Sequence, residues 1–400
     1  MDKSGAGQEL NLLVQDPNYR VGRRGLLRVG ALLGAAAVAG GVTGGVAGYL
    51  GGRAAEQTST GKQPQSAAGA VGGPRRRERL LNIYNWSDYI DDRTIPLFQA
   101  YANIRVNYDV YSSNDDLLAK LRAGPTQYDI IVPTNWFIPT YRRLGLLQPL
   151  RQDLIGNLVN LDKTFVETDY DPGNKYTIPW QWGTTGLGYN TNRVPGGKVD
   201  SWAALYAPDP SLGGRISILR EVTEVIGCTL IYLGKNPNST KDADLQQVID
   251  TFTRLRRQLR TLKFSSDTYI DELAAGETWL AQGWSGDVFQ AQADNPDVRY
   301  VIPKEGSLRW ADVMCVPKDA PHPENAARFM NYVLHPQVAA RISKYVSYGT
   351  PVPLAKALLP AEQLNDPGIY PPASVKLSFM TLTDQRLKVL QGVYNTIIKA

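Results

Sequence analysis

An alternation of short apolar strands and helices, which starts near residue 80, places the tightest constraint on how this chain can fold. Strands are predicted over residues 80–83, 105–111 and 128–133, and helices over residues 94–101 and 113–122. The third strand, Tyr-Asp-Ile-Ile-Val-Pro, is a mostly apolar run of the kind found in parallel strands that are buried on both faces. Because strands that alternate with helices pair in parallel, the sequence predicts an α/β fold with a parallel sheet.

A second α/β run follows a Gly-rich stretch at residues 176–190, which is predicted to be a strand that crosses between two lobes. Four hundred residues exceed one comfortable core, which supports two lobes. We expect one lobe to comprise residues 80–184 with 312–355, and the other to comprise residues 185–311 with 356–400. The further elements expected are helices near 222–233, 242–261, 324–334 and 337–344, and strands that end within 281–287 and 313–316.

Polar and aromatic side chains follow the first predicted strand directly, in the order Trp86, Ser87, Asp88, Tyr89. Open α/β sheets place ligand-binding groups outside the carboxyl ends of their strands. Two aromatic walls, a hydroxyl and a carboxylate suit a small organic cation that carries methylenes. Taken by themselves, these residues are explained more simply by a turn cap at Ser87 or Asp88 and a core position for Trp86.

Two later stretches repeat this pattern and favour a binding site. The third strand runs into Thr134, Asn135 and Trp136, again a polar and aromatic strand end. Trp310 and Asp312 alternate along a predicted strand, so both side chains lie on one face. Core packing is a poor explanation for that pair, because it would bury a carboxylate beside Trp310.

Composition excludes several classes of protein. Residues 1–79 hold 11 Lys/Arg and 5 Asp/Glu, whereas residues 80–400 hold 32 and 33, so the folded part is nearly neutral and no nucleic-acid partner is expected. Cys228 and Cys315 lie far apart without a CxxC motif, so no metal site or cofactor is expected and both are interpreted as core residues. His322 and His335 lie in Pro-flanked, surface-type stretches, which leaves little basis for Ser/His/Asp catalysis.

Residues 1–53 are interpreted as an export signal. Gly22–Arg28, Gly-Arg-Arg-Gly-Leu-Leu-Arg, resembles the twin-arginine motif, and Val29–Gly52 carries no charge. The uncharged stretch could span a bilayer, but its Gly and Ala content suits a twin-arginine signal better than a permanent anchor. We therefore expect cleavage and release into the periplasm, with a membrane tether through an uncleaved signal as the alternative. Residues 54–79 are rich in Gly, Ser, Gln and Arg and are interpreted as a disordered linker.

Six separated stretches beyond residue 80 occur in one order: Asn82–Ile90, Tyr128–Pro133, Tyr189–Asn190, Gly283–Ala291, Pro303–Val316 and Asp366–Pro372. Together they resemble the periplasmic spermidine- and putrescine-binding proteins that serve polyamine ABC transporters. The resemblance implies a class II periplasmic binding-protein fold, in which two α/β lobes joined by crossing strands trap a ligand between them. It implies binding rather than catalysis, a polyamine ligand, and the membrane permease subunits of an ABC transporter as partners. We expect a monomer.

The resemblance also assigns ligand-binding residues, which are Trp86, Ser87, Asp88, Tyr89, Thr134, Trp136, Glu221, Glu224, Trp284, Asp287, Trp310, Asp312 and Tyr348. Glu221 and Glu224 are separated by one helical turn, a spacing that is also common on solvated helix faces, so the resemblance alone carries these two. Five acids among aromatic rings fit protonated amines, through charge-assisted hydrogen bonds and cation–π contacts. Their mutual repulsion should hold an empty cleft open.

The expected ligand preference combines two patterns. Ser87, Asp88 and Asp287 resemble the putrescine binders, whereas Trp136, Glu221 and Trp310 resemble the spermidine binders. We expect spermidine to be preferred and putrescine to bind more weakly. Two alternatives stay open, namely a class II receptor for another small cation or a metal chelate, and an exported hydrolase. The hydrolase would use Ser285 in Gly-Trp-Ser-Gly, for which the sequence offers no plausible histidine partner.

Overall fold

Two long antiparallel strands, β4 (Thr177–Asn190) and β9 (Ser307–Cys315), lie at the centre of the computed structural model, which describes residues 79–259 and 261–399. Within these residues they belong to a ten-stranded sheet with the order β2-β1-β3-β9-β4-β7-β5-β6, to which β10 is added on β9 and β8 on β4. All fourteen residues of β4 are buried. This pair is the predicted crossing connection.

The other strands are β1 (Leu80–Trp86), β2 (Arg105–Tyr111), β3 (Ile130–Ile131), β5 (Ile216–Leu219), β6 (Lys263–Ser265), β7 (Leu280–Trp284), β8 (Val298–Val301) and β10 (Leu377–Ser378). The α-helices are α3 (Thr94–Ala102), α4 (Asn114–Arg122), α5 (Ile138–Arg143), α6 (Ala203–Tyr206), α7 (Val222–Tyr232), α8 (Asp242–Leu259), α9 (Tyr269–Ala275), α10 (Ser285–Asp294), α11 (Pro323–Val333), α12 (Pro336–Val346), α13 (Pro353–Lys356), α14 (Ala361–Leu364) and α15 (Asp384–Lys399). The 3₁₀ segments are η1 (Asn135–Phe137), η2 (Gln152–Leu154), η3 (Gly156–Asn160), η4 (Lys163–Phe165), η5 (Pro172–Asn174), η6 (Pro195–Gly197) and η7 (Pro210–Leu212).

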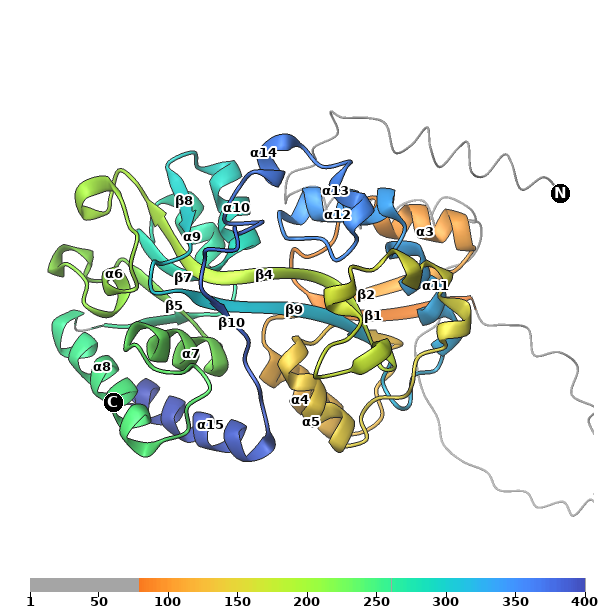
Figure 1. Ribbon diagram of the computed structural model, residues 1–400, viewed down its shortest axis with the longest axis horizontal. Helices are drawn as coiled ribbons and strands as arrows, with labels where there is room; N and C mark the ends of the chain where they lie inside the picture. Colours follow the sequence, from red (N-terminus) through yellow and green to blue (C-terminus); the bar gives the residue numbers. More distant parts are fainter. Residues whose placement is uncertain (1–78, 260, 400) are drawn as a thin grey trace, which may run out of the picture. The chain divides into compact units, whose positions relative to one another are not determined.

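The described residues form two α/β lobes with β4 and β9 running through both (Figure 1). The first lobe contains β1–β3 with helices α3, α4, α5, α11 and α12, and the second contains β5–β8 with helices α6–α10 and α15. Strands β2 and β3 pair in parallel with β1, and β6 and β7 pair in parallel with β5. The predicted strand–helix alternation is therefore confirmed in both lobes.

The start of α4 illustrates how the sequence fixes these elements. The Ser113 hydroxyl accepts a hydrogen bond from the Asp116 backbone N–H at 3.1 Å, which caps the helix. Asp115 and Asp116 also place negative charge in its first turn, where the helix dipole favours it. By contrast, the strand predicted over residues 128–133 is only two residues long, because Pro133 has no N–H to extend the ladder and the chain turns into η1.

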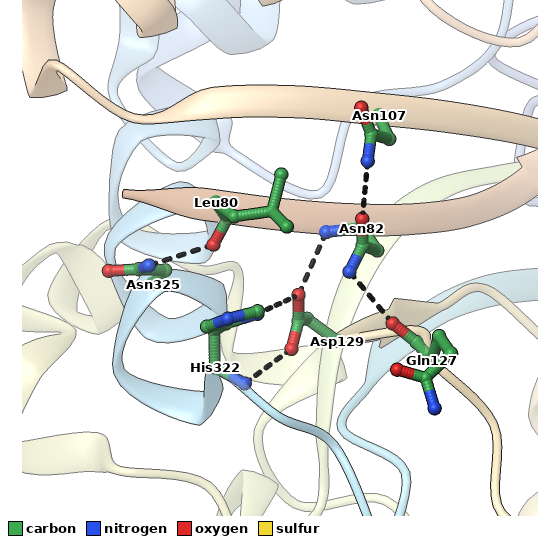
Figure 2. A network of polar contacts seen from close by, with 7 residues as sticks. All are labelled: Leu80, Asn82, Asn107, Gln127, Asp129, His322 and Asn325. Carbon is green, nitrogen blue, oxygen red and sulfur yellow. Dashed lines mark hydrogen bonds and ion pairs between the residues drawn. The ribbon is translucent and has the colours of Figure 1, made fainter. Parts of the chain in front are cut away.

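A polar network ties α11 to the amino end of β1 (Figure 2). The Asp129 carboxylate accepts hydrogen bonds from the Asn82 backbone N–H at 2.8 Å and from the His322 backbone N–H at 2.5 Å, and its Oδ2 lies 3.0 Å from His322 Nδ1. Asn325 donates to the Leu80 carbonyl at 2.8 Å. His322 lies in a surface stretch, as predicted, since Asp319 and Pro321 are exposed, but its own side chain is only 9% exposed against a fully buried carboxylate.

The predicted export signal, and all of the predicted linker except Arg79, lie outside the described residues. Within the part of the chain that the structure describes, no helix is both long enough and apolar enough to cross a bilayer.

Candidate functional site

The carboxyl ends of strands from both lobes converge on one cavity. Glu221, Asp267 and Asp287 follow β5, β6 and β7, while Thr134 follows β3. Of the thirteen predicted site residues, eleven line this cavity. The first lobe and the segment after α12 contribute Trp86, Ser87, Tyr89, Thr134 and Tyr348. Strand β9 contributes Trp310 and Asp312, and the second lobe contributes Glu221, Glu224, Trp284 and Asp287.

Two predicted residues do not line the cavity. Asp88 is exposed and adopts a left-handed backbone conformation with a φ of 50°, in the turn that follows β1. Trp136 is 2% exposed and belongs to η1, where it borders a different cavity with Phe379 and Met380. The preceding residue, Asn135, accepts a hydrogen bond from the Ala311 backbone N–H at 3.1 Å, so the chain runs beside β9 at this point. The assignment of these two residues to ligand binding stays a prediction.

Four lining residues were not predicted, and they are Ser112, Asn114, Ser266 and Asp267. Asn114 is the first residue of α4, directly after β2. Ser266 and Asp267 follow β6, a strand of three residues that the sequence analysis did not identify. A polar pair after the short alternating stretch Leu262–Phe264 was the only available signal for them.

Asp312 lies at the end of a chain of hydrogen bonds that joins the two lobes. The Thr134 hydroxyl donates to Asp312 Oδ1 at 2.8 Å and accepts from the Asn114 side-chain amide at 3.0 Å. The Asn114 backbone N–H then donates to Glu221 Oε1 at 3.1 Å. Glu221 thereby places its carboxylate at the amino end of α4 in the opposite lobe, where helix N–H groups favour negative charge.

The other two inner carboxylates are held by hydroxyl and indole donors. Tyr348 donates to Asp287 Oδ1 at 2.7 Å, and Tyr269 donates to Asp287 Oδ2 at 2.9 Å. Thr185 donates to Glu224 Oε2 at 2.5 Å, and the Trp284 indole N–H donates to Glu224 Oε1 at 3.3 Å. These contacts fix the orientation of both carboxylates.

Burial dominates the electrostatics of the cavity. Desolvation raises the pKa of Glu224 and the pKa of Asp312 to about 7 each, against the opposing effect of their hydroxyl donors. Burial, reinforced by the charge of Asp115, raises the pKa of Glu221 well above its usual range. Among the described residues that line the cavity there is no Lys, Arg or His, so five acidic side chains share the site without a basic neighbour in the lining.

Aromatic rings form the remaining walls. The ring centroids of Trp86 and Trp284 are 5.8 Å apart in an edge-to-face arrangement across the two lobes. Tyr348 lies 5.2 Å from Trp310 and 5.2 Å from Tyr89, measured between ring centroids. Rings beside carboxylates can bind an organic cation, since a π face attracts the charge and also packs against methylene groups.

The cavity is narrow in this structure, with a volume of about 40 Å³. That volume holds about three water molecules. Contacts between the lobes close it, including the bond from Asn114 to Glu221 and one from the Ser87 hydroxyl to Asp267 Oδ2 at 3.3 Å. An organic ligand of several carbons therefore requires the lobes to separate before it can enter.

The described lining of the cavity lacks a serine–histidine pair. Ser285 is buried, and its hydroxyl has no hydrogen-bond partner within the described part of the chain. Neither histidine lines the cavity, and His322 is paired with Asp129 at the amino end of β1. No serine and histidine are therefore brought together among the described residues that line the cavity.

Comparison with known proteins gives consistent relatives. The sequence model of the family described as bacterial extracellular solute-binding protein matches residues 96–371. The putrescine-binding periplasmic protein PotF of Escherichia coli is 39% identical over 80% of this chain and 90% of its own length. The spermidine/putrescine-binding periplasmic protein 1 of Haemophilus influenzae is 32% identical over 73% of this chain and 81% of its own length.

Solved structures agree with these relatives. The spermidine/putrescine ABC transporter substrate-binding protein PotD of Streptococcus pneumoniae has a TM-score of 0.68 and 30% identity, with 80% of this chain and 99% of that chain covered. The predicted fold class, two α/β lobes joined by crossing strands as in class II periplasmic binding proteins, is confirmed.

Proposed function

The chain belongs to the bacterial extracellular solute-binding proteins, and on that premise we propose that it binds polyamines between its two lobes and delivers them to an ABC importer. Members of this family bind solutes, so the protein is a binding protein and not an enzyme. One observation carries the choice of ligand: five carboxylates and five aromatic rings line one cavity that has no basic side chain in its described lining.

The chemistry of the lining matches a flexible polycation. Each ammonium group can pair with a carboxylate through charge-assisted hydrogen bonds, which are about twice as strong as neutral ones. The methylene chains between the amines can pack on Trp86, Trp284 and Trp310. Neutral ligands would leave the buried carboxylates without a counter-charge, and each such group costs free energy in a closed cleft.

Within the polyamines we propose that spermidine is preferred and that putrescine binds more weakly. Five lining acids support this choice, since a triamine can neutralise more of them than a diamine. Putrescine is the competing candidate, because PotF, the relative with the higher identity, is named as a putrescine binder. Trp310→Phe together with Glu221→Ala should shift the preference toward putrescine. Competitive calorimetric titration of both ligands into wild type and the double variant tests this, and a preference for putrescine in wild type would overturn the proposal.

The alternatives differ in their ligands. A receptor for another small cation or for a metal chelate would share the fold and the acidic lining. A thermal-shift screen against amines, amino acids, sugars, oxyanions and metal chelates separates these cases. A bound ligand stabilises the fold by about 2.7 kcal/mol at a hundred times its Kd. Stabilisation by polyamines alone is expected, and turnover of an ester or amide by the pure protein would contradict a binding role.

We further propose that the protein is exported through the twin-arginine route, is released by cleavage and acts as a monomer with the permease subunits. The lobe boundaries also remain a proposal, with residues 80–184 and 312–355 in one lobe and residues 185–311 and 356–400 in the other. Replacing Arg23 and Arg24 by Lys should abolish export as measured by cell fractionation. Export of the double variant would exclude the twin-arginine route.

A further inference from the structure

Among the described residues that line the cavity, Asp267 is the one carboxylate that was not predicted from the sequence. It lies in the turn between β6 and α9, and the Ser265 and Thr268 hydroxyls bond to each other across this turn at 2.7 Å. The Tyr269 backbone N–H donates to the Ser265 hydroxyl at 3.1 Å, and the Ile270 backbone N–H donates to the Asp267 carbonyl at 3.1 Å. The turn is thus tied to the start of α9, which holds the Asp267 side chain at the cavity.

Asp267 differs in its burial and in its partner from three of the inner carboxylates, whereas the fourth, Asp287, is half-buried like Asp267. Glu221, Glu224 and Asp312 are 5%, 2% and 5% exposed, and their carboxylates accept bonds within the closed network. Asp267 is only half-buried, and it meets the opposite lobe through the Ser87 hydroxyl at a long 3.3 Å. This contact is longer than the usual O–H···O range of about 2.5–3.0 Å and brings no counter-charge, so it is weaker than the ion-paired hydrogen bond that an ammonium group would make to the same carboxylate.

A series of contacts leads from the inner acids to Asp267. The Trp284 indole N–H donates a hydrogen bond to Glu224, and the ring centroids of Trp284 and Trp86 are 5.8 Å apart. Trp86 precedes Ser87, whose hydroxyl reaches Asp267. The two indoles therefore lie between an inner carboxylate, Glu224, and an outer one, Asp267. A ligand with two ammonium groups joined by a methylene chain has the complementary order: each ammonium would face a carboxylate and the methylenes would face the indoles.

We propose that Asp267 binds the outer ammonium group of a long polyamine, and that it thereby determines whether a triamine is preferred over a short diamine. This inference rests on the proposed polyamine function. A short diamine places both charges among the inner acids and leaves Asp267 hydrated at the edge of the cleft. A triamine spans the indole pair and replaces the Ser87 contact with an ion pair. Ligand length is therefore distinguished at Asp267 in addition to Glu221 and Trp310. Glu224, Asp287 and Asp312 provide binding that both ligands share.

The test is calorimetric titration of spermidine, putrescine and octamethylenediamine into wild type and three variants. Octamethylenediamine has the length of spermidine without its middle amine. Asp267→Asn should weaken spermidine and octamethylenediamine by about tenfold or more, because a hydrogen bond to a charged group is lost, while putrescine changes less than about threefold. Ser87→Ala keeps the Asp267 carboxylate but removes its hydroxyl partner, and it should not reproduce the selective loss of the two long ligands that Asp267→Asn shows.

Asp294→Asn is the matched control, since it removes an exposed acid from the end of α10 outside the cavity lining. It should change none of the three affinities by more than about twofold. Equal losses for long and short ligands in Asp267→Asn, or no loss at all, would overturn the role of Asp267. Failure of wild type to bind any of the three amines would refute the polyamine function itself, and the inference would fall with it.

Discussion

Tyr348 and Asp287 are joined by two hydrogen bonds: the Tyr348 hydroxyl donates to Asp287 Oδ1 at 2.7 Å, and the Asp287 backbone N–H donates to the same hydroxyl oxygen at 3.3 Å. Tyr348 follows α12 of the first lobe, whereas Asp287 lies in the first turn of α10 in the second. The pair therefore fixes a ligand-facing carboxylate and also contributes to closure of the lobes.

Removal of the Tyr348 hydroxyl should weaken polyamine binding while the fold stays intact. In Tyr348→Phe the ring still packs against Trp310 and Tyr89. Asp287 loses the hydrogen bond from Tyr348 and keeps the one from Tyr269. Hydrogen bonds to charged groups contribute about 1.5–3 kcal/mol, so we expect about a tenfold or greater loss of affinity, measured by calorimetry.

Tyr345→Phe is the control for that experiment. Its hydroxyl donates to Asp92 at 3.1 Å outside the cavity, and the side chain is 37% exposed. It should bind spermidine as wild type does. If both variants bind like wild type, the Tyr348 hydroxyl does not contribute to the site.

Asp312 should be more important for binding than Asp88, although both were predicted from the sequence. Asp312 is 5% exposed beside Trp310 in the cavity lining, whereas Asp88 is exposed and outside it. Loss of one partner of a buried charge pair costs about 3–5 kcal/mol, so Asp312→Asn should weaken polyamine binding by at least about a hundredfold. Asp88→Asn should change it by less than about threefold. The reverse order of effects in calorimetry would place the binding site elsewhere.

The features that the sequence predicts well are those with local causes. Strand–helix alternation predicts β1, α3, β2 and α4, and the alternation of Trp310 and Asp312 correctly predicts that they share one face of β9. The resemblance to a known family supplied Glu221 and Glu224, whose spacing alone was ambiguous. Both line the cavity because β5 ends directly before α7.

The positions of residues outside the cavity lining, and of lining residues that were not predicted, depend on nonlocal structure. Trp136 follows its strand by only a few residues, but the 3₁₀ turn η1 carries it to another cavity. Asp267 reaches the cleft only because the three-residue β6 pairs with β5, which is more than forty positions earlier in the chain. No local pattern encodes that pairing, so the sequence offered no means of ranking Asp267 above the other acids of the chain.

Polyamine affinity should increase with pH across the range in which the inner acids ionise. The pKa of Glu224 and the pKa of Asp312 are each raised to about 7 by burial, and an ammonium group binds only their ionised forms well. Below about pH 7 the ligand must displace protons, so affinity should fall by up to about tenfold per pH unit for each of the two carboxyls. Calorimetry in buffers of different ionisation enthalpy should detect the released protons. Affinity that is flat between about pH 5.5 and 8 would contradict this.

The stability of the ligand-free protein should show the opposite trend. These two carboxyls bind protons more tightly in the folded than in the unfolded chain, so their contribution to the free energy of unfolding is largest below their unfolded pKa values and decreases as pH rises through about 7. Glu224→Gln removes one of them, and its unfolding free energy should depend less on pH than that of wild type. Urea unfolding at several pH values measures the difference, and parallel curves would exclude Glu224 as a source.

A pair of Gly→Ala substitutions tests how closely the site is packed. A Cβ atom on Gly183 of β4 would lie 2.8 Å from the Trp310 ring and 2.9 Å from the Tyr348 ring, whereas one on Gly392 of α15 would meet nothing within 4 Å. Gly183→Ala should therefore displace two walls of the cavity, lower the free energy of unfolding by about 1–3 kcal/mol and weaken polyamine binding. Gly392→Ala should raise stability by about 0.5–1 kcal/mol, because alanine is favoured inside a helix, and should leave binding unchanged. Urea unfolding and calorimetry on both variants measure these effects. If Gly183→Ala binds polyamines with wild-type affinity, Trp310 and Tyr348 can shift without affecting the ligand. The positions of these two rings would then not be required for binding.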